Sequence, residues 1–363
     1  MITKSLHFGK ALSVALLVLL LAIGMTEAFA QTQVATLQHG DDMSMFYGQN
    51  ALVEAYSVAE TGDIITLSSG TFTPCDITKA ITLRGAGMKP NTLSGATPTI
   101  IAGSFNISIP TNNNAYLTME GIRNDHQIKY SGDLSNPKFI RCQFNEIVCS
   151  FIQTSTITYT GRITNATFKN CIVTGTLQLS GNSNANCMNS IIWNPVCVST
   201  TVSNFNFLNC IVYKFNPAEI YSSAFQNCII MHFHMGDGSG NFGLPVSNTV
   251  YYCASTRGGE VFVNFSNGTN WQMVNCSDLF KTFDHDFSQS EQIIWSDSYS
   301  FELTEDAQSL YVGSDGKQIG IYGGNLPFSS RPSYMVVKRC NVANKSTIDG
   351  KLSVEIEVFT DEE

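Results

Sequence analysis

Charged residues are scarce in the middle of this 363-residue chain. Between positions 161 and 250 the charged residues are Arg162, Lys169, Lys214, Glu219 and Asp237. An acid–base site or a metal site needs several ionisable groups close together. The two acids of this region are eighteen residues apart in loop-like stretches, so the central part of the chain argues against a catalytic site there.

Basic residues and long apolar runs are also few. The chain has 20 Lys and Arg against 29 Asp and Glu, and without the leader that we predict at residues 1–30 the numbers are 18 and 28. The resulting negative charge repels nucleic acid and anionic lipid, so we expect neither as a partner. After residue 30 no apolar run reaches the length of a membrane-spanning helix.

Residues 1–30 have the features of a secretory signal peptide. Lys4 and Lys10 form a basic start, Ala11–Ile23 is a short apolar run, and Ala28–Ala30 is an A-x-A cleavage site. No cysteine follows the run as a lipid attachment site. We therefore expect a soluble, exported chain in the periplasm, at the cell surface or outside the cell.

A short sequence motif, or phrase, recurs about every twenty residues in the second half of the chain. An apolar residue stands two positions before an asparagine, and a small residue and two mostly β-branched residues follow it. The asparagines are Asn170, Asn189, Asn209, Asn227 and Asn248. This period is too short for a strand plus a crossover helix, and it predicts a β-solenoid whose turns stack about 4.8 Å apart. Asparagine tolerates the left-handed backbone of a sharp bend, and its amide can bond to the copies above and below. A β-sandwich with regularly spaced strands is the alternative.

The N-terminal pattern is a short amphipathic helix, Gln49–Glu60, followed by the strand Ile64–Leu67, a Gly-Thr-Phe turn and a further strand, Ile81–Leu83. With the stacked phrase, it resembles the right-handed parallel β-helix of the pectin-lyase-like superfamily. It is most similar to secreted β-helix proteins of gut anaerobes, many without an assigned activity. The resemblance covers most of residues 48–330 and implies an all-β solenoid closed by an N-terminal capping helix, which would cover unpaired strand edges.

The chain is then divided into the leader, a β-helix with its cap at residues 31–330, and a tail at residues 331–363. In the tail, Tyr334–Val342 and Lys351–Val358 flank an Asp-Gly turn, which predicts a short β-hairpin. We expect this hairpin to dock on the stack or to link to a partner.

Cysteines occupy one position of the repeat. Cys171, Cys210 and Cys228 share it with Ser190 and Thr249. A position that accepts Cys, Ser and Thr requires a small side chain, which favours buried free thiols over a ladder of disulfides.

Several polar groups are candidates for chemistry. Asp125 and the triplet Asp284, His285 and Asp286 are candidate catalytic or metal-ligating residues, although a solvated loop is the simpler interpretation of the triplet. His232 and His234 lie two residues apart, as two ligands on one side of a strand would. The same two positions are also typical of the stem of a loop. We expect no cofactor.

An aromatic stripe is the feature that favours binding. We call the repeat position of Cys171, Ser190, Cys210, Cys228 and Thr249 the small slot. The position three residues later is occupied by Thr174, Trp193, Tyr213, Met231 and Tyr252. If the small slot faces inward, this stripe faces outward, where aromatic rings are platforms for sugars. Trp193, Tyr213 and Tyr252 are therefore the candidate ligand-binding residues. There are two alternatives: the opposite orientation would place these rings in the core, or a loop would cover them.

These observations support two functions. The first is a secreted, non-catalytic β-helix module that binds a polysaccharide or another glycan, or serves as a surface scaffold. The alternative is a polysaccharide lyase or glycoside hydrolase that acts on a uronate-containing polymer through loop acids such as Asp125, Asp284 and Asp286.

Overall fold

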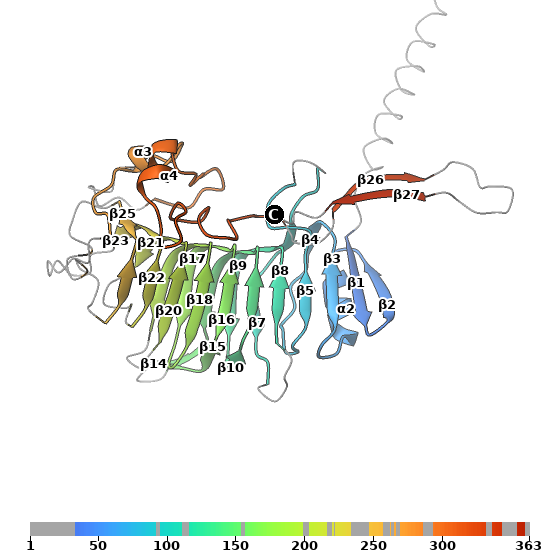
Figure 1. Ribbon diagram of the computed structural model, residues 1–363. Coiled ribbons are helices and arrows are strands. Elements are labelled where there is room, and N and C mark those ends of the chain that lie inside the picture. Colours follow the sequence, from blue (N-terminus) through green and yellow to red (C-terminus); the bar gives the residue numbers. More distant parts are fainter. Residues whose placement is uncertain are drawn as a thin grey trace, which may run out of the picture.

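A computed structural model shows an all-β chain dominated by two long, mainly parallel sheets (Figure 1). It describes residues 33–91, 95–110, 116–153, 157–198, 203–215, 220, 222–233, 247–256, 262, 265, 269–285, 293–331, 336–342 and 354–359. Each repeat contributes one strand to each sheet, and this arrangement fits a parallel β-helix or solenoid. No helix in the described ranges is long and apolar enough to cross a membrane.

The first sheet has eleven strands. In spatial order they are β2 (Asp42–Tyr47), β1 (Val34–His39), β3 (Ile64–Leu67), β5 (Thr82–Arg84), β8 (Thr118–Glu120), β11 (Lys138–Ile140), β16 (Ala166–Lys169), β18 (Asn184–Met188), β20 (Asn204–Leu208), β22 (Ala224–Gln226) and β24 (Thr249–Tyr251). Strand β1 pairs antiparallel with β2 and β3, and the pairs from β3 onward are parallel.

The second sheet is built from parallel pairs. Its ten strands are β25 (Ala254–Ser255), β23 (Ile229–Phe233), β21 (Ile211–Phe215), β19 (Ile191–Cys197), β17 (Ile172–Leu179), β12 (Gln143–Cys149), β9 (Ile122–Tyr130), β6 (Thr99–Ile101), β4 (Gly70–Phe72) and β7 (Phe105–Ile107), which pairs with β9. Smaller pairs are β10 (Gly132–Ser135) with β15 (Gly161–Thr164), and β13 (Phe151–Gln153) with β14 (Ile157–Tyr159). Helices α3 (Cys276–Leu279) and α4 (Glu305–Leu310) follow the sheets.

The predicted asparagine bends are present in four successive repeats. Asn170, Asn189, Asn209 and Asn227 have φ angles of 53°, 46°, 51° and 55°. The backbone N–H of Asn189 donates to the carbonyl of Leu208 in the next repeat at 3.0 Å, so these asparagines form a column along the sheets. We call Asn170, Asn189, Asn209 and Asn227 the asparagine column. The left-handed bend was predictable because asparagine adopts it more readily than most residues.

The fifth member of the column was assigned wrongly from the sequence. Strand β24 places Gln226 beside Tyr251, so Tyr252, and not Asn248, follows Asn227 in the column. Tyr252 has the left-handed φ of 53° that the bend requires. Asn248 instead accepts a hydrogen bond from the backbone N–H of Ser223 at 2.7 Å. The motif around Asn248 resembles the repeat, but the buried Val250 pairs with the buried Phe225. The bend that corresponds to Asn227 therefore comes after Val250, at Tyr252, and not before it.

The same shift places Cys253, and not Thr249, in the small slot. The slot now holds Cys142, Cys171, Ser190, Cys210, Cys228 and Cys253 on successive repeats, all buried. The ten cysteines that the structure describes are free thiols, and among them Cys171, Cys210 and Cys228 are buried, as predicted for this position. Burial raises the pKa of Cys171 to about 12, which keeps its thiol protonated. Stacked phenylalanines fill the core beside the slot, with Phe139 and Phe168 at 4.8 Å and Phe207 and Phe225 at 4.9 Å between ring centroids.

The side chains of Asn189 and Asn227 bind a C-terminal segment. We call residues 313–325 the closing segment. Asn227 Oδ1 accepts from the backbone N–H of Ser314 at 2.9 Å. Asn189 Nδ2 donates to the carbonyls of Ile321 and Gly323 at 2.9 and 2.8 Å. The expected amide ladder between copies is therefore replaced by contacts to a strand-free segment that runs back along the column.

Helix α2 (Ala51–Val58) matches the predicted amphipathic helix, and it buries Leu52 and Tyr56 against the first strands. The hydroxyl of Tyr56 accepts from the backbone N–H of Thr78 at 2.5 Å and of Lys79 at 2.8 Å. At the C-terminal end of the chain, β26 (Val336–Val342) and β27 (Val354–Phe359) form the predicted antiparallel hairpin. The side chains of this hairpin lie outside the described residues.

Candidate functional site

A C-terminal segment lies over the outward face of the second sheet, and we call residues 293–303 the strap. The backbone N–H of Ile293 donates to the hydroxyl of Tyr213 at 2.8 Å. Trp295 meets Trp193 edge to face, with 5.3 Å between ring centroids. Trp193 in turn stacks on Tyr213 at 3.7 Å. The strap thus extends the fold by a second apolar cluster outside the main core.

The aromatic stripe is therefore buried, which corrects the expectation that it is exposed. Trp193 and Tyr213 point away from the main core, as the repeat predicts, but only 7% and 1% of their surfaces are accessible. The strap covers them, because two neighbouring aromatic rings would leave a large apolar patch in water. Burial raises the pKa of Tyr213 to about 12. Tyr252 lies at a bend, and its place in the stripe is taken by Thr256, which donates to the carbonyl of Met231 at 2.7 Å.

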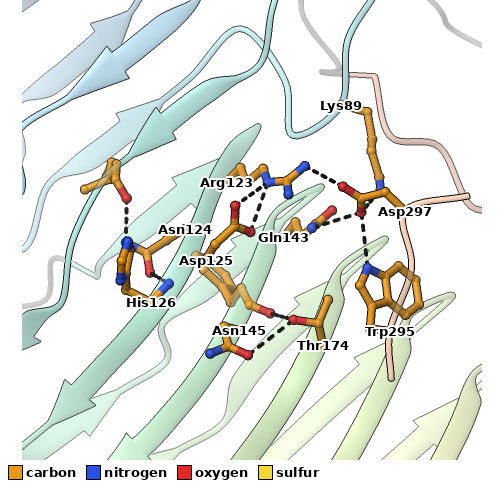
Figure 2. Close-up of polar contacts among 12 residues, drawn as sticks. Lys89, Arg123, Asn124, Asp125, His126, Gln143, Asn145, Thr174, Trp295 and Asp297 are labelled. Atoms are coloured by element: carbon orange, nitrogen blue, oxygen red, sulfur yellow. Dashed lines mark hydrogen bonds and ion pairs between the residues drawn. The ribbon is translucent and has the colours of Figure 1, made fainter. Parts of the chain in front are cut away.

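Next to the aromatic rings, the strap carries Asp297, which is the centre of a polar cluster (Figure 2). Its carboxylate accepts from Lys89 Nζ at 2.5 Å, from Arg123 Nη1 at 2.7 Å and from Gln143 Nε2 at 3.2 Å. Trp295 Nε1, on the strap itself, donates to the same group at 3.1 Å. Lys89 lies between β5 and β6, Arg123 is on β9, and Gln143 is on β12. We call Lys89, Arg123 and Gln143 the cradle.

The charges of this cluster are balanced. Arg123 also donates from Nε to both oxygens of Asp125, at 2.9 and 2.8 Å. Partial burial opposes ionisation of Asp297, but hydrogen bonds from Lys89 and Trp295 and the charge of Lys89 outweigh it and hold the pKa of that carboxyl well below its usual range. Burial likewise opposes the charge of Arg123, yet its hydrogen bonds to Asp125 and Asp297 raise its pKa. Two cations thus meet two carboxylates.

A β-bulge places Asp125 and His126 on the surface. Phe144 pairs with Asn124 and Glu146 with Gln127, so one residue of β12 opposes two residues of β9. The buried side chain of Asn124 fixes this bulge, because Nδ2 donates to the carbonyls of Ile101 and Gly103 and Oδ1 accepts from the N–H of His126. Bulges of this kind re-aim side chains and occur often beside functional sites.

Polar side chains continue onto the next two strands. Gln127 Nε2 donates to Glu146 Oε2 at 2.7 Å between β9 and β12. A second bulge follows in β17, where the hydroxyl of Thr174 lies 3.5 Å from Asn145 Oδ1. Gly175 is required there, since a Cβ at that position would come within 2.8 Å of the carbonyl oxygen of Asn145. These half-buried or exposed groups form a row on β9, β12 and β17, and the next strand, β19, carries Trp193, which contacts Trp295.

The loop after Phe283 contains further sequence candidates. Asp284 is exposed there and His285 is half-buried, while Asp286 lies outside the described residues. His234 and the side chain of His232 also lie outside them. Within the described ranges, no group of three or more His, Cys, Asp or Glu side chains is arranged to hold a metal.

The cradle, Trp295 and Asp297 were not singled out as site residues from the sequence. One local signal was available, since Arg123 and Asp125 lie two apart on a strand and therefore on one face.

Comparisons of this chain with models of protein families, with curated proteins and with solved structures find no match. The site is thus interpreted from its own geometry.

Proposed function

We propose that this chain is an exported, non-catalytic module that binds a polysaccharide or another glycan on the outward face of its second sheet. In this proposal the fold is a right-handed parallel β-helix of the pectin-lyase-like type with α2 as its cap. The observation that carries the proposal is the row of polar groups from β9, β12 and β17 beside the partly exposed indole of Trp295.

This row suits a saccharide for two reasons. Guanidinium, amide, carboxylate and hydroxyl groups can each bond sugar hydroxyls, and here Arg123, Asn145, Glu146 and Thr174 offer all four kinds on three adjacent strands. An aromatic ring beside such groups can lie against the apolar face of a sugar. Most binding sites for small ligands combine an apolar wall with a few placed polar groups in this way.

The ion pairs argue against hydrolysis at this site. A glycosidase needs one carboxyl group that holds a proton and can donate it to the leaving oxygen. Asp297 is kept ionised by Lys89 and Trp295, and Asp125 accepts both of its close contacts from Arg123. Asp297 is therefore not placed to act as the general acid, which supports a binding role.

A glycan array with the mature chain tests this proposal. We expect binding that falls at least tenfold in Arg123→Gln, because the guanidinium is itself one of the groups proposed to bond the saccharide and it holds Asp125 beside the row. Lys138→Ala is the matched control, since Lys138 is an exposed cation on β11 of the first sheet. Equal loss in both variants, or loss in neither, would show that the ligand does not bind at this face.

One observation favours an enzyme as the second candidate. The bulge in β9 exposes His126 next to Asp125, and an exposed histidine can serve as a general base. The corresponding function is a polysaccharide lyase or glycoside hydrolase that acts on a uronate-containing polymer. Steady formation of unsaturated product or reducing ends from a polyuronate, lost in His126→Gln, would replace the binding proposal by this one.

A further inference from the structure

The cradle surrounds a single carboxylate that comes from a distant part of the chain. Lys89, Arg123 and Gln143 are held by the sheet and its loops, whereas Asp297 is on the strap, between 154 and 208 residues later. All three donate to one or other oxygen of Asp297. The donor groups therefore form an arrangement that fits one anionic group, independently of the segment that supplies it.

The charges of the cluster set the charge of the group that fits. Lys89 and Arg123 carry two positive charges, and Asp125 compensates one of them through Arg123 Nε. Without Asp297 the cluster would keep one positive charge on side chains that are only 21% exposed. An unpaired charge in such a place is unfavourable, so the cradle requires one anionic partner.

Gln143 provides a second, independent observation. Its side chain is buried, its Nε2 donates to Asp297, and its Oε1 is a buried acceptor without a hydrogen-bond partner in the described structure. A buried acceptor of this kind is rare in folded proteins. A ligand that carries a hydroxyl next to its anionic group would supply the missing donor when it replaces Asp297.

We infer that the cradle is a binding site for the anionic group of a saccharide, carboxylated or sulfated, and that Asp297 occupies it as an internal ligand. This inference rests on the proposed saccharide-binding function. A bound acidic sugar takes the place of the Asp297 carboxylate and releases the tip of the strap. The chain is acidic as a whole, but charges farther than about 10 Å are largely screened at 0.1 M salt, so the short contacts of the cradle decide recognition.

An internal ligand lowers the apparent affinity for an external one. A group tethered by a short segment acts at an effective concentration of about millimolar or higher. Only the fraction of molecules with an open cradle binds the saccharide. The apparent dissociation constant is the intrinsic one divided by this fraction, so it is higher. Removal of the Asp297 carboxylate should therefore increase affinity for an acidic saccharide about tenfold or more.

Small anions test the cradle without any assumption about the saccharide. In Asp297→Ala the carboxylate is gone and its space is free, so acetate or sulfate should raise the melting temperature by several degrees over chloride at equal ionic strength. Asp297→Asn keeps the space filled and should show no such gain. Asp133→Ala is a further control, because it removes the carboxylate of an exposed Arg162–Asp133 pair at 2.7 Å elsewhere on the surface. Equal melting temperatures of Asp297→Ala in acetate, sulfate and chloride would overturn the inference.

Matched saccharides then test the ligand class. Calorimetry with glucuronate oligomers, a sulfated oligosaccharide and their neutral counterparts should show about tenfold tighter binding of an acidic member to Asp297→Ala than to the unmodified chain. Binding of the neutral members should not change. If saccharides bind but Asp297→Ala gains neither anion nor acidic sugar, the inference fails and the proposed function stands. If acetate is bound but no saccharide is, the proposed function and the saccharide part of the inference fail together.

Discussion

Arg123 on β9 donates to Asp297 at 2.7 Å across 174 positions of the chain. This contact joins the outward face of the second sheet to the tip of the strap. The strap also covers the stacked rings of Trp193 and Tyr213. One segment thus both completes an apolar cluster and neutralises a polar site, so stability and binding can be tested separately by substitutions under the strap and at Asp297.

Trp193→Ala tests the apolar cluster under the strap. Trp193 is buried between Tyr213 and Trp295, and its removal leaves a cavity under the strap. We expect a loss of about 3–5 kcal/mol in the free energy of unfolding, as for other buried aromatic residues. Urea denaturation measures it. Tyr251→Ala is the control, since Tyr251 is an exposed aromatic on β24 and should change stability by about 0.5 kcal/mol or less.

Gly324→Ala tests the contact between the closing segment and the asparagine column. A Cβ at Gly324 would lie 2.2 Å from Asn209 Nδ2, and its φ of 76° is strained for any other residue. Gly316 has a similar φ of 77° but open space around it, so Gly316→Ala carries the backbone strain alone, about 1 kcal/mol. We expect the loss in unfolding free energy to be clearly larger for Gly324→Ala. Equal losses would mean that the closing segment does not press against the column.

Asn124→Ala tests the bulge. Asn124 is fully buried and makes two donor contacts and one acceptor contact that hold Asp125 and His126 at the surface. Leaving the partner groups unsatisfied should reduce the unfolding free energy by about 1–3 kcal/mol. It should also weaken glycan binding, because Asp125 then loses its place beside Arg123. A variant that loses stability but binds as before would separate the bulge from the site.

The N-terminal end provides a pH-dependent contact. His39 Nδ1 lies 2.8 Å from Asp63 Oδ1, and the hydrogen bond to Asp63, followed by the charges of Asp63, Glu60 and Asp42, raises the pKa of His39 above its ordinary value. A raised histidine pKa stabilises the fold fully below the ordinary value, and the gain is lost as pH rises through the raised one. Unfolding measured between pH 5 and 8, in roughly the range where histidine titrates, should show this decline in the unmodified chain. His39→Gln should flatten it.

The repeat could be predicted because its signals are local. Asparagine at a left-handed bend, a small slot and two β-branched residues recur within a few positions, and stacking follows from the period. The error at Asn248 arose because the same local phrase occurred one bend early. The site could not be predicted in this way, since Lys89, Gln143 and Asp297 are brought together only when the strap folds back over the sheet.

Hydrogen exchange with a bound saccharide locates the face that binds it. The strongest glycan of an array should slow exchange of backbone amides in β9, β12 and β17, the strands that carry Arg123, Asn145 and Thr174. Amides on the first sheet, such as those of β16 and β18, should exchange at unchanged rates. Protection confined to the first sheet, with β9 and β12 unaffected, would contradict a saccharide site on this face.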